Sequence, residues 1–265
     1  MRTLYKVKHE ERAQIAPLFE GIWDSMVISY LQGYQGEGFV DRFPDPQFGL
    51  IVSGEYSFPG GNPDADGARE MIEHAFDYIE GNETTFIYSP DKLEWRDMIL
   101  ECHPDKAKEV MRYWIVQKDY DFDEEILKEY INKLSSGFAI VPFDEEMYNQ
   151  AMSSEWSREF CETFENADDY LSRGFGFGIM DKGQLVSGIS TMTVYDGGTE
   201  IQIATREDYR RKGLALPCAA RFLLEAKARG IRPCWDAANE TSRHMALKLG
   251  YEYNGEYSTV HMCRE

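Results

Sequence analysis

Apolar side chains recur along the chain with two periods, and these periods predict where helices and strands lie. Between residues 15 and 31, apolar and aromatic residues return every three or four positions, which predicts one helix with an apolar face that ends before Gly33. An aromatic stripe at this spacing is typical of a packed core. The other elements expected in the first half are strands at 48–53, 84–88 and 111–116 and helices at about 67–80, 92–102 and 124–134.

The second half begins with a short apolar strand and a longer, mostly charged helical region. The elements expected in it are a strand at 138–141, helices over about 144–165, and strands at 175–180, 184–194 and 200–205. Asp181-Lys-Gly183 separates the second and third strands and is typical of a tight hairpin turn.

The stretch from Glu200 to Gly230 combines a strand, a turn and a helix. Residues of the strand alternate at a period of two, the pattern of one buried face. Gly213 lies in the turn, where a residue without a Cβ lets the backbone approach a ligand closely. Pro217 falls in the first turn of the helix, where its missing N–H is tolerated, and Gly230 is typical of a helix end.

This segment is basic in an otherwise acidic chain. Residues 206–232 hold eight Lys or Arg and three Asp or Glu, a balance of about +5, whereas the whole chain has a formal charge of -19. The free N–H groups of a helix start, with Arg210, Arg211 and Lys212 beside them, suit phosphate oxygens. The alternative is a solvated surface helix, but the strand, glycine, proline and basic cluster occur together and in this order. The segment therefore predicts a phosphate-binding turn.

Arg210-x-x-Gly213-x-Ala215 after a strand resembles the acetyl-coenzyme A signature of the GNAT superfamily of N-acetyltransferases, (Q/R)-x-x-G-x-(G/A). A second landmark follows at the expected distance, because Asn239 opens a helix that closes in Leu-Gly-Tyr251. The resemblance covers roughly residues 137–263 and implies an α/β (mixed α+β) fold with a splayed mixed sheet flanked by helices. Few residues remain after Tyr251, so the last strand of the family is expected to be missing or to come from the N-terminal half.

The resemblance also implies which residues bind the coenzyme. In the family, backbone amides of the turn bind the pyrophosphate of coenzyme A, and a strand amide faces the thioester carbonyl. Carried onto this chain, the cofactor-binding residues are Ile203, Ala204, Thr205, Arg210, Arg211, Lys212, Gly213, Leu214, Ala215, Asn239 and Ser242. Asn239 also suits a plain helix N-cap, and the two roles are compatible.

Glu200 is the candidate catalytic general base, directly or through a water, since it starts the strand beside the thioester. The alternative is an exposed edge carboxylate that binds the cationic substrate. Many GNAT enzymes carry a tyrosine seven residues after the asparagine, which protonates the leaving thiolate, but Ala246 stands there in this chain. Another residue, such as Tyr251 or Tyr257, replaces it, or the thiolate leaves unaided.

The first half has the same order of elements as residues 199–263, namely strand, loop, helix, strand, helix and strand. The domains expected are an N-terminal α/β domain at 1–121, a linking helix at 122–136 and a GNAT acetyltransferase domain at 137–265. One hypothesis makes the N-terminal half a degenerate GNAT-like copy that lost its coenzyme site, because its glycine loop carries Asp64 and Asp66 and no neighbouring basic residue. The alternative is an unrelated α/β domain.

The composition and charge of the chain limit the cofactors, the binding partners and the cellular location that we expect for the protein. The five cysteines are odd in number and scattered, and none stands at metal spacing from another Cys or His, so we expect reduced thiols and no metal. No apolar run approaches bilayer length, which favours a cytoplasmic protein without a membrane partner. The strong negative charge disfavours nucleic acid and favours a small cationic amine.

Together these features predict an N-acetyltransferase that uses acetyl-CoA as co-substrate and acetylates a primary amine of a small cationic acceptor. The long chain resembles the GNAT subgroup that includes zwittermicin A resistance acetyltransferases, which implies an antibiotic or amino-polyol acceptor. One alternative is a non-catalytic GNAT-fold protein that binds or senses coenzyme A or acyl-CoA, and another is a protein acetyltransferase. The chain is expected to be a monomer or a homodimer.

Overall fold

The structure is a computed structural model that describes residues 3–79, 81, 83–88, 92–116 and 122–264. Its chain forms two compact units, the first made of Met1–Arg112 with Glu256–Glu265 and the second of Tyr113–Gly255. The domain boundaries expected from the sequence, at 121/122 and 136/137, stay a prediction. Residues 117–121, next to the first of these boundaries, lie outside the described part of the chain.

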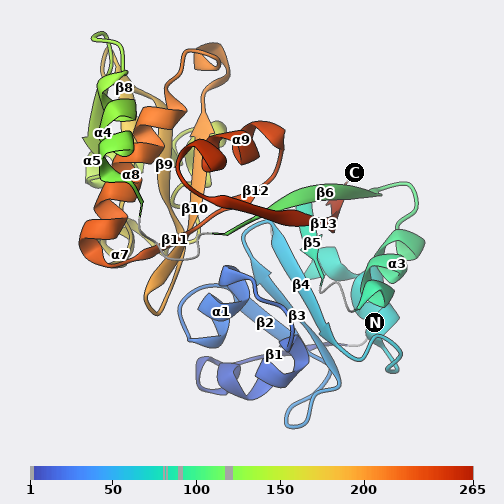
Figure 1. The fold of residues 1–265 in the computed structure, drawn as a ribbon. Helices are drawn as coiled ribbons and strands as arrows, with labels where there is room; N and C mark the ends of the chain where they lie inside the picture. The colour runs from blue at the N-terminus through green and yellow to red at the C-terminus, as the bar shows by residue number, and fades with distance from the viewer. Residues whose placement is uncertain (1–2, 80, 82, 89–91, 117–121, 265) are drawn as a thin grey trace. The chain divides into compact units, whose positions relative to one another are not determined.

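The first unit is built on an antiparallel meander extended by a parallel strand (Figure 1). Strands β1 to β4 pair antiparallel in sequence order, and β4 pairs in parallel with β5. Its elements are β1 (Tyr5–Lys6), the 3₁₀ helix η1 (His9–Phe19), α1 (Ser25–Leu31), β2 (Glu37–Val40), β3 (Phe48–Ser53), β4 (Tyr56–Gly61), α2 (Ala68–Glu73), the 3₁₀ helix η2 (Ala75–Asp77), β5 (Glu83–Ile87), α3 (Leu93–Cys102) and the start of β6 (Ala107–Val116).

The second unit contains the five-stranded sheet β11-β10-β9-β8-β7. Strands β7 to β10 pair antiparallel in sequence order, and β10 pairs in parallel with β11. Its elements are α4 (Glu124–Asn132), β7 (Ala139–Pro142), α5 (Glu145–Met152), α6 (Glu155–Arg158), α7 (Ala167–Arg173), β8 (Gly176–Asp181), β9 (Gln184–Tyr195), β10 (Gly198–Thr205), the 3₁₀ helix η3 (Glu207–Tyr209), α8 (Ala215–Arg229), β11 (Arg232–Cys234), β12 (Asp236–Ala237), α9 (Glu240–Lys248) and the start of β13 (Glu252–Cys263).

The two units repeat one order of strand pairing. In each, four strands pair antiparallel in sequence order, and the fourth pairs in parallel with a fifth that follows an intervening helix. The hypothesis of a GNAT-like copy predicts this agreement, whereas an unrelated domain does not. The mixed α/β fold, with helices flanking mixed sheets, is confirmed.

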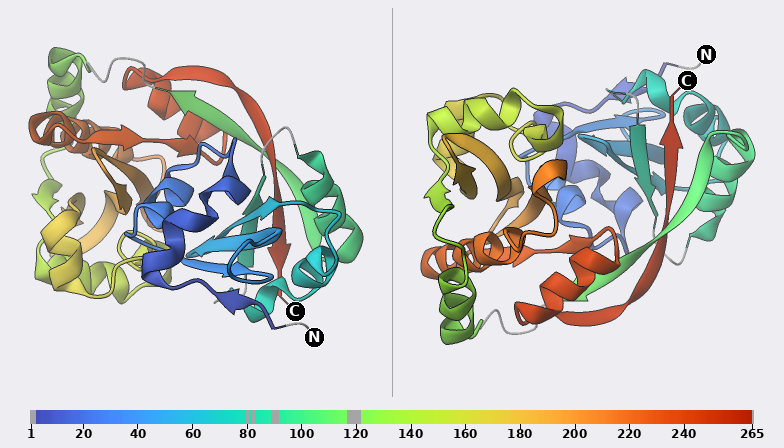
Figure 2. Two further views of the ribbon diagram at one scale, coloured as in Figure 1. Left: turned by 90° about the horizontal axis from the view of Figure 1, so that it is seen from below. Right: turned by 90° about the horizontal axis from the view of Figure 1, so that it is seen from above.

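A strand follows Tyr251, but its described pairing is with β5 of the first unit and it is not part of the sheet β11-β10-β9-β8-β7, so the expectation that the last family strand is missing or comes from the N-terminal half stays a prediction. β13 has twelve residues, and residues 259–263 pair antiparallel with β5. It is the red strand that ends beside β5 in Figures 1 and 2. Its first residues are exposed and only its second part is buried, so the alternation that marks a strand is weak in the sequence.

The single helix expected over residues 15–31 is wrong in its middle, because the chain leaves the helix between η1 and α1. Gly21 has a φ of 88° there, and Asp24 starts α1 by accepting a hydrogen bond from the Met26 N–H at 2.8 Å. Trp23 falls in this break and is 84% exposed, so it is not part of the core. The helical region expected over about 144–165 likewise divides into α5 and α6.

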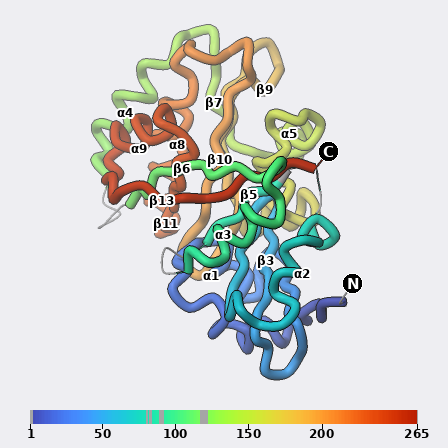
Figure 3. Tube along the Cα trace, turned by 90° about the vertical axis from the view of Figure 1, so that its right-hand side faces the viewer, coloured from blue at the N-terminus to red at the C-terminus, as the bar shows by residue number. Residues whose placement is uncertain are grey.

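Two apolar clusters cover opposite faces of the second unit's sheet. Val186 and Ile203 belong to the cluster under α8, while their neighbours Leu185 and Ala204 belong to the cluster under α5 and α7. Because consecutive strand residues point to opposite faces, α8 covers one face and α5 and α7 the other. α4 packs on α8 (Figure 3). Among the described residues, no helix has the length and apolar character needed to cross a bilayer.

Candidate active site

The turn predicted to bind phosphate joins β10 to α8. Arg211 and Gly213 adopt left-handed backbone conformations, with φ of 62° and 74°. A Cβ on Gly213 would meet no atom within 4 Å, and Arg210 to Gly213 are all exposed. The turn is therefore an open, basic loop whose backbone a ligand can approach closely.

The helix that follows begins without a cap. α8 has fifteen residues, and in the described chain no side chain hydrogen-bonds its first N–H groups. Leu214 is buried just before the helix and anchors the turn to the core. Pro217, the third helical residue, has no N–H to satisfy. The first-turn amides and the helix dipole thus favour an anion where the basic residues also gather.

Two of the basic side chains near the turn pack on one ring. The Nζ of Lys212 lies 3.9 Å from the centroid of Tyr209, and the guanidinium carbon of Arg206 lies 4.6 Å from it. The Tyr209 hydroxyl donates to Asp181 at 2.6 Å, which fixes the ring. The side chain of Arg210 makes a different contact: its Nε donates to the carbonyl of Thr205 at 3.3 Å.

Strand β10 separates from its parallel neighbour part-way along its length. In the described structure, β11 pairs with β10 at residues 198–200, and β12 pairs instead with β6. From Ile201 to Thr205, β10 pairs with β9 on its other side. The open edge, which includes Ile203 and Ala204, can offer backbone N–H and C=O groups to an extended ligand.

Glu200 lies where the strands separate. It is 7% exposed, and its Oε1 accepts a hydrogen bond from the Asp236 N–H, the first residue of β12, at 3.2 Å. In the strand registers it pairs with Thr193 on β9 and Cys234 on β11. This burial does not fit the exposed position that the alternative role for Glu200 assumes.

Asn239 and Ser242 lie at the start of α9. The Oδ1 of Asn239 accepts a hydrogen bond from the Ser242 N–H at 3.0 Å, which is the expected N-cap. The Oγ of Ser242 accepts one from the Trp235 indole N–H at 2.9 Å. The start of this helix is therefore ordered by the two side chains expected to contact the coenzyme.

Replacing Asn239 by alanine is expected to lower the free energy of unfolding by about 1 kcal/mol, because α9 loses the acceptor for its first N–H groups. Asn239→Asp keeps that acceptor and serves as the control. Urea unfolding of the three chains at pH 7 measures the difference. Equal stability of Asn239→Ala and the wild type would show that the cap contributes nothing here.

The family model of the GNAT acetyltransferases matches residues 16–260. The chain belongs to this family. A curated relative, the "Uncharacterized N-acetyltransferase YdfB" of Bacillus subtilis strain 168, is 25% identical over 266 residues, which cover 97% of this chain and 98% of the relative. The prediction of an N-acetyltransferase enzyme is thereby confirmed.

Solved structures of GNAT proteins agree with this assignment. A GCN5-related N-acetyltransferase-like protein from Streptococcus suis is 32% identical and has a TM-score of 0.85, with 96% of this chain and 99% of that chain covered. A tandem GNAT protein from the clavulanic acid biosynthesis pathway is 12% identical, with a TM-score of 0.57 and 98% of each chain covered. The second likeness is one of fold, and it agrees with the strand order repeated in the two units.

In this GNAT acetyltransferase, the position of the family's tyrosine is part of the core. Ala246 is fully buried and belongs to the cluster that also contains Trp235. Tyr251 is buried too, and its hydroxyl donates to the carbonyl of Pro233 at 2.8 Å. Within the second unit, these contacts give both residues a structural role.

The structure adds polar residues that the sequence analysis did not identify. Gln202 lies on β10 just beyond the shift in the β9–β10 register between Glu200 and Ile201, and its amide donates to Glu159, which follows α6. Thr193 is the cross-strand partner of Glu200. The alternation along β10 could have indicated Gln202, but no sequence signal joins it to a residue 43 positions away.

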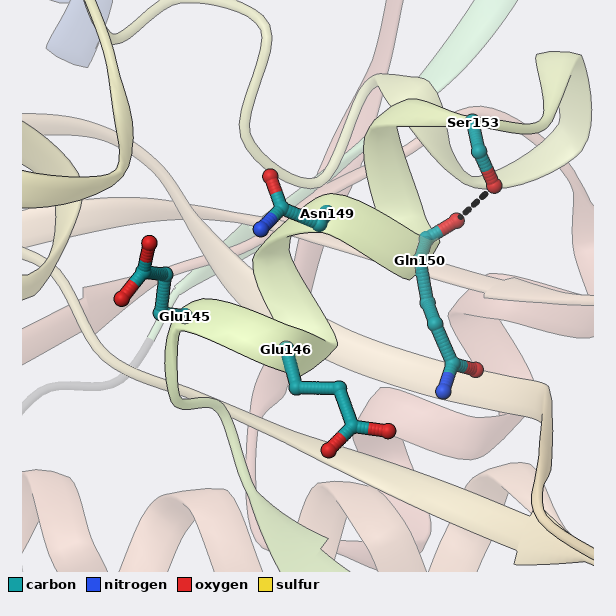
Figure 4. A pocket seen from close by; sticks show the side chains of 5 residues that line it. All are labelled: Glu145, Glu146, Asn149, Gln150 and Ser153. Carbon is teal, nitrogen blue, oxygen red and sulfur yellow. Dashed lines mark hydrogen bonds between the residues drawn. The ribbon is translucent and has the colours of Figure 1, made fainter.

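A hollow of about 510 Å³ lies along α5. Figure 4 shows its lining side chains, which all come from this helix and the residue after it: Glu145, Glu146, Asn149, Gln150 and Ser153. Carboxylates, amides and a hydroxyl do not favour phosphate. The side chain of Gln150 accepts a hydrogen bond from the Leu185 N–H at 3.2 Å, which ties the helix to β9. We assign this hollow a structural role.

Proposed function

We propose that the protein transfers an acetyl group from acetyl-CoA to a primary amine of a small cationic acceptor. The observation that carries this proposal is the open basic turn at Gly213, directly before an uncapped helix and beside the free edge of β10. GNAT acetyltransferases generally use acetyl-CoA, and this arrangement supplies donors and positive charge for its phosphates.

The residues present fit the coenzyme. Arg210, Arg211, Lys212 and the amides from Gly213 to Ala215 would hold the pyrophosphate. The edge residues Ile203 to Thr205 would hydrogen-bond the extended arm, and Asn239 and Ser242 would contact it from the start of α9. When bound, the coenzyme supplies the acetyl group as a thioester. No metal is needed for this transfer, and the described residues include no cluster of three ligating side chains.

Glu200 is the residue proposed to prepare the amine. An ammonium group cannot attack a carbonyl, so the acceptor must lose a proton first. A buried carboxylate at the junction of β10, β11 and β12 can take that proton, directly or through a water. The Asp236 N–H donates to one of its oxygens and so holds the carboxylate at this junction.

The acceptor is proposed to be a small polycation. The chain has a formal charge of -19, which steers cations toward it. An antibiotic or amino-polyol with free amino groups meets this description and follows from the resemblance to the zwittermicin A resistance acetyltransferases. We also propose that the protein acts in the cytoplasm, without nucleic acid or a membrane, as a monomer or homodimer.

Activity is assigned to the second half, with a catalytic domain at 137–265, a linking helix at 122–136 and an N-terminal domain at 1–121. In the first unit, a Cβ on Gly60 of β4 would lie 2.7 Å from both the Leu18 carbonyl oxygen and the Phe19 ring. This face of β4 is therefore covered by the protein itself. The loop before α2 carries Asp64 and Asp66, which disfavour phosphate.

A second candidate function is binding or sensing of coenzyme A without turnover. Ala246 favours it, because no tyrosine stands where the family's general acid is expected. Calorimetric titration with acetyl-CoA, followed by thiol release with a panel of amines, separates the two. Binding with amine-dependent thiol release supports the transferase, and binding without release by any amine supports the sensor. Absence of acetyl-CoA binding would contradict both.

A further inference from the structure

The segment that forms β11 and β12 has one buried side and one accessible side. From Pro233 to Ala237 burial alternates residue by residue: Pro233, Trp235 and Ala237 are buried, whereas Cys234 and Asp236 are partly exposed. Trp235 and Ala237 belong to the apolar cluster under α8. Because consecutive residues of an extended chain point to opposite sides, Cys234 and Asp236 project away from that cluster.

Glu200 lies on the same side as Cys234. The two residues are partners in the parallel β10–β11 ladder, and neighbours in a ladder project to one side of the sheet. Tyr195 agrees with this, because its hydroxyl lies 3.0 Å from the Cys234 Sγ, and a Cβ on Gly198 would clash with its ring. Gly198 precedes Glu200 by two residues, and the register of β10 is regular between them. The ring therefore crosses β10 on the side that carries Glu200.

Trp114 extends this accessible side onto β6. In the antiparallel β6–β12 ladder, Trp114 is opposite Asp236 and Tyr113 is opposite Ala237. Directly opposite residues lie about 5 Å apart and project to the same face, so Trp114 lies beside Asp236, whose N–H donates to Glu200. Tyr113 packs against the cluster under α8, which agrees with an opposite direction for Trp114. All of these residues belong to the second unit.

The ring of Trp114 is accessible to a ligand. Its side chain is 47% exposed, and within the described ranges it makes no aromatic, cation–π or hydrogen-bond contact. A single exposed aromatic residue needs no explanation by itself. This one, however, lies beside Asp236 and Glu200, so an indole face and two carboxylates occur together. Both groups attract cations, and tryptophan is the side chain that binds them best through its ring.

We infer that the ring of Trp114 binds a second cationic group of the acceptor, whose first amine reacts beside Glu200. The inference rests on the proposed function and narrows the acceptor to molecules with two basic nitrogens. The two groups have different tasks, because the reacting amine must lose its proton, whereas a cation held on a ring keeps its charge. A cation–π contact needs no N–H donor, so the second group is recognised by its charge even when it is fully methylated.

The test compares two primary amines of the same shape. One carries a trimethylammonium group at the far end of its chain, and the other carries an uncharged tert-butyl group, with chains from ethyl to hexyl. Calorimetry measures their binding to the full chain with coenzyme A added, a condition without turnover. The wild type is expected to bind the best trimethylammonium compound about tenfold more tightly than its tert-butyl partner.

Trp114→Leu is expected to reduce this preference to about twofold, the part that the acidic chain contributes without the ring. Trp114→Phe keeps a ring and is expected to retain an intermediate preference. In steady-state assays, the leucine variant should raise KM for the cationic amine and leave both kcat and the affinity for acetyl-CoA unchanged. Thermal unfolding of each variant checks that the fold is intact.

Tyr253→Leu is the matched control. Tyr253 is also an exposed aromatic residue of the second unit, but its ring packs on Tyr113, with the centroids 6.4 Å apart, and so lies on the side opposite to Trp114. It is expected to keep the full preference. Equal binding of the two amines by the wild type, or a preference that Trp114→Leu keeps, would overturn the inference and leave the transferase standing. A preference that depends on Trp114 but comes without thiol release would support the inference and contradict the transferase.

Discussion

Replacing Gly213 by glutamate is expected to weaken acetyl-CoA binding by at least about 100-fold, which corresponds to roughly 3 kcal/mol. Gly213 has a φ of 74°, and a Cβ there would point into open space. The substitution would therefore place a carboxylate inside the turn whose amides and basic side chains are proposed to bind the pyrophosphate. The new carboxylate would repel the negatively charged pyrophosphate, and its side chain would also block the close approach of the ligand that a glycine allows.

Gly230→Glu is the matched control for this experiment. Gly230 ends the same helix, with a φ of 67° and no atom within 4 Å of a built Cβ. Both variants thus carry the same kind of backbone strain, roughly 1–2 kcal/mol for a side chain in the left-handed region. Calorimetric titration with acetyl-CoA and a thermal unfolding curve are measured on each. Equal affinity of the Gly213 and Gly230 variants would contradict the placement of the coenzyme.

The local features of the site could be predicted from the sequence because they depend on neighbours in the chain. The left-handed backbone at Gly213 and Gly230 follows from the absence of a Cβ, and both glycines have it. Asn239 was expected to cap a helix, and its side chain does so. Each of these features is decided within about four residues, the range over which turn and capping preferences act.

Features that depend on distant residues could not be predicted in this way. Nothing near Glu159 indicates that it meets Gln202, and nothing near Thr193 indicates that its hydroxyl lacks a partner. Trp23 is an error of the other kind, a contact that was predicted and does not form. Helical spacing placed it in the core, but the helix is interrupted at Gly21 and Trp23 is exposed. The spacing of apolar residues indicates which side of a possible helix would be apolar, but tertiary contacts decide whether that helix forms and packs on that side.

The strand order repeated in the two units helps to explain where the candidate site lies. In both units the fourth and fifth strands run parallel and separate early, after three paired residues in the second unit and two in the first. The separation opens an edge on β10, whereas in the first unit Leu18 and Phe19 lie against Gly60 on the corresponding strand. One architecture thus carries the proposed coenzyme site in one unit and closely packed side chains on the corresponding strand of the other, which supports our assignment of the site to the second half.

Replacing Glu200 by glutamine is expected to lower kcat by about 100-fold or more, with acetyl-CoA affinity unchanged. Glutamine has nearly the same shape and its amide oxygen can still accept the hydrogen bond from the Asp236 N–H. It cannot take a proton from an ammonium group. The substitution thus removes general-base catalysis and keeps the contact that joins β10 to β12. Steady-state kcat and KM at saturating acetyl-CoA, measured from pH 6 to 9, test this expectation.

The same measurements separate the two roles open to Glu200. If the carboxylate mainly binds the acceptor, the loss falls on KM and kcat is kept; if it takes the proton, kcat falls and the acidic limb of the pH profile disappears. Glu200→Ala adds a structural comparison, since it also removes the acceptor for the Asp236 N–H and is expected to cost about 1–2 kcal/mol of unfolding free energy. A glutamine variant with full kcat would exclude Glu200 as the base. Glutamine keeps the shape and the hydrogen bond of the side chain but cannot take a proton, so catalysis would then not need the carboxylate.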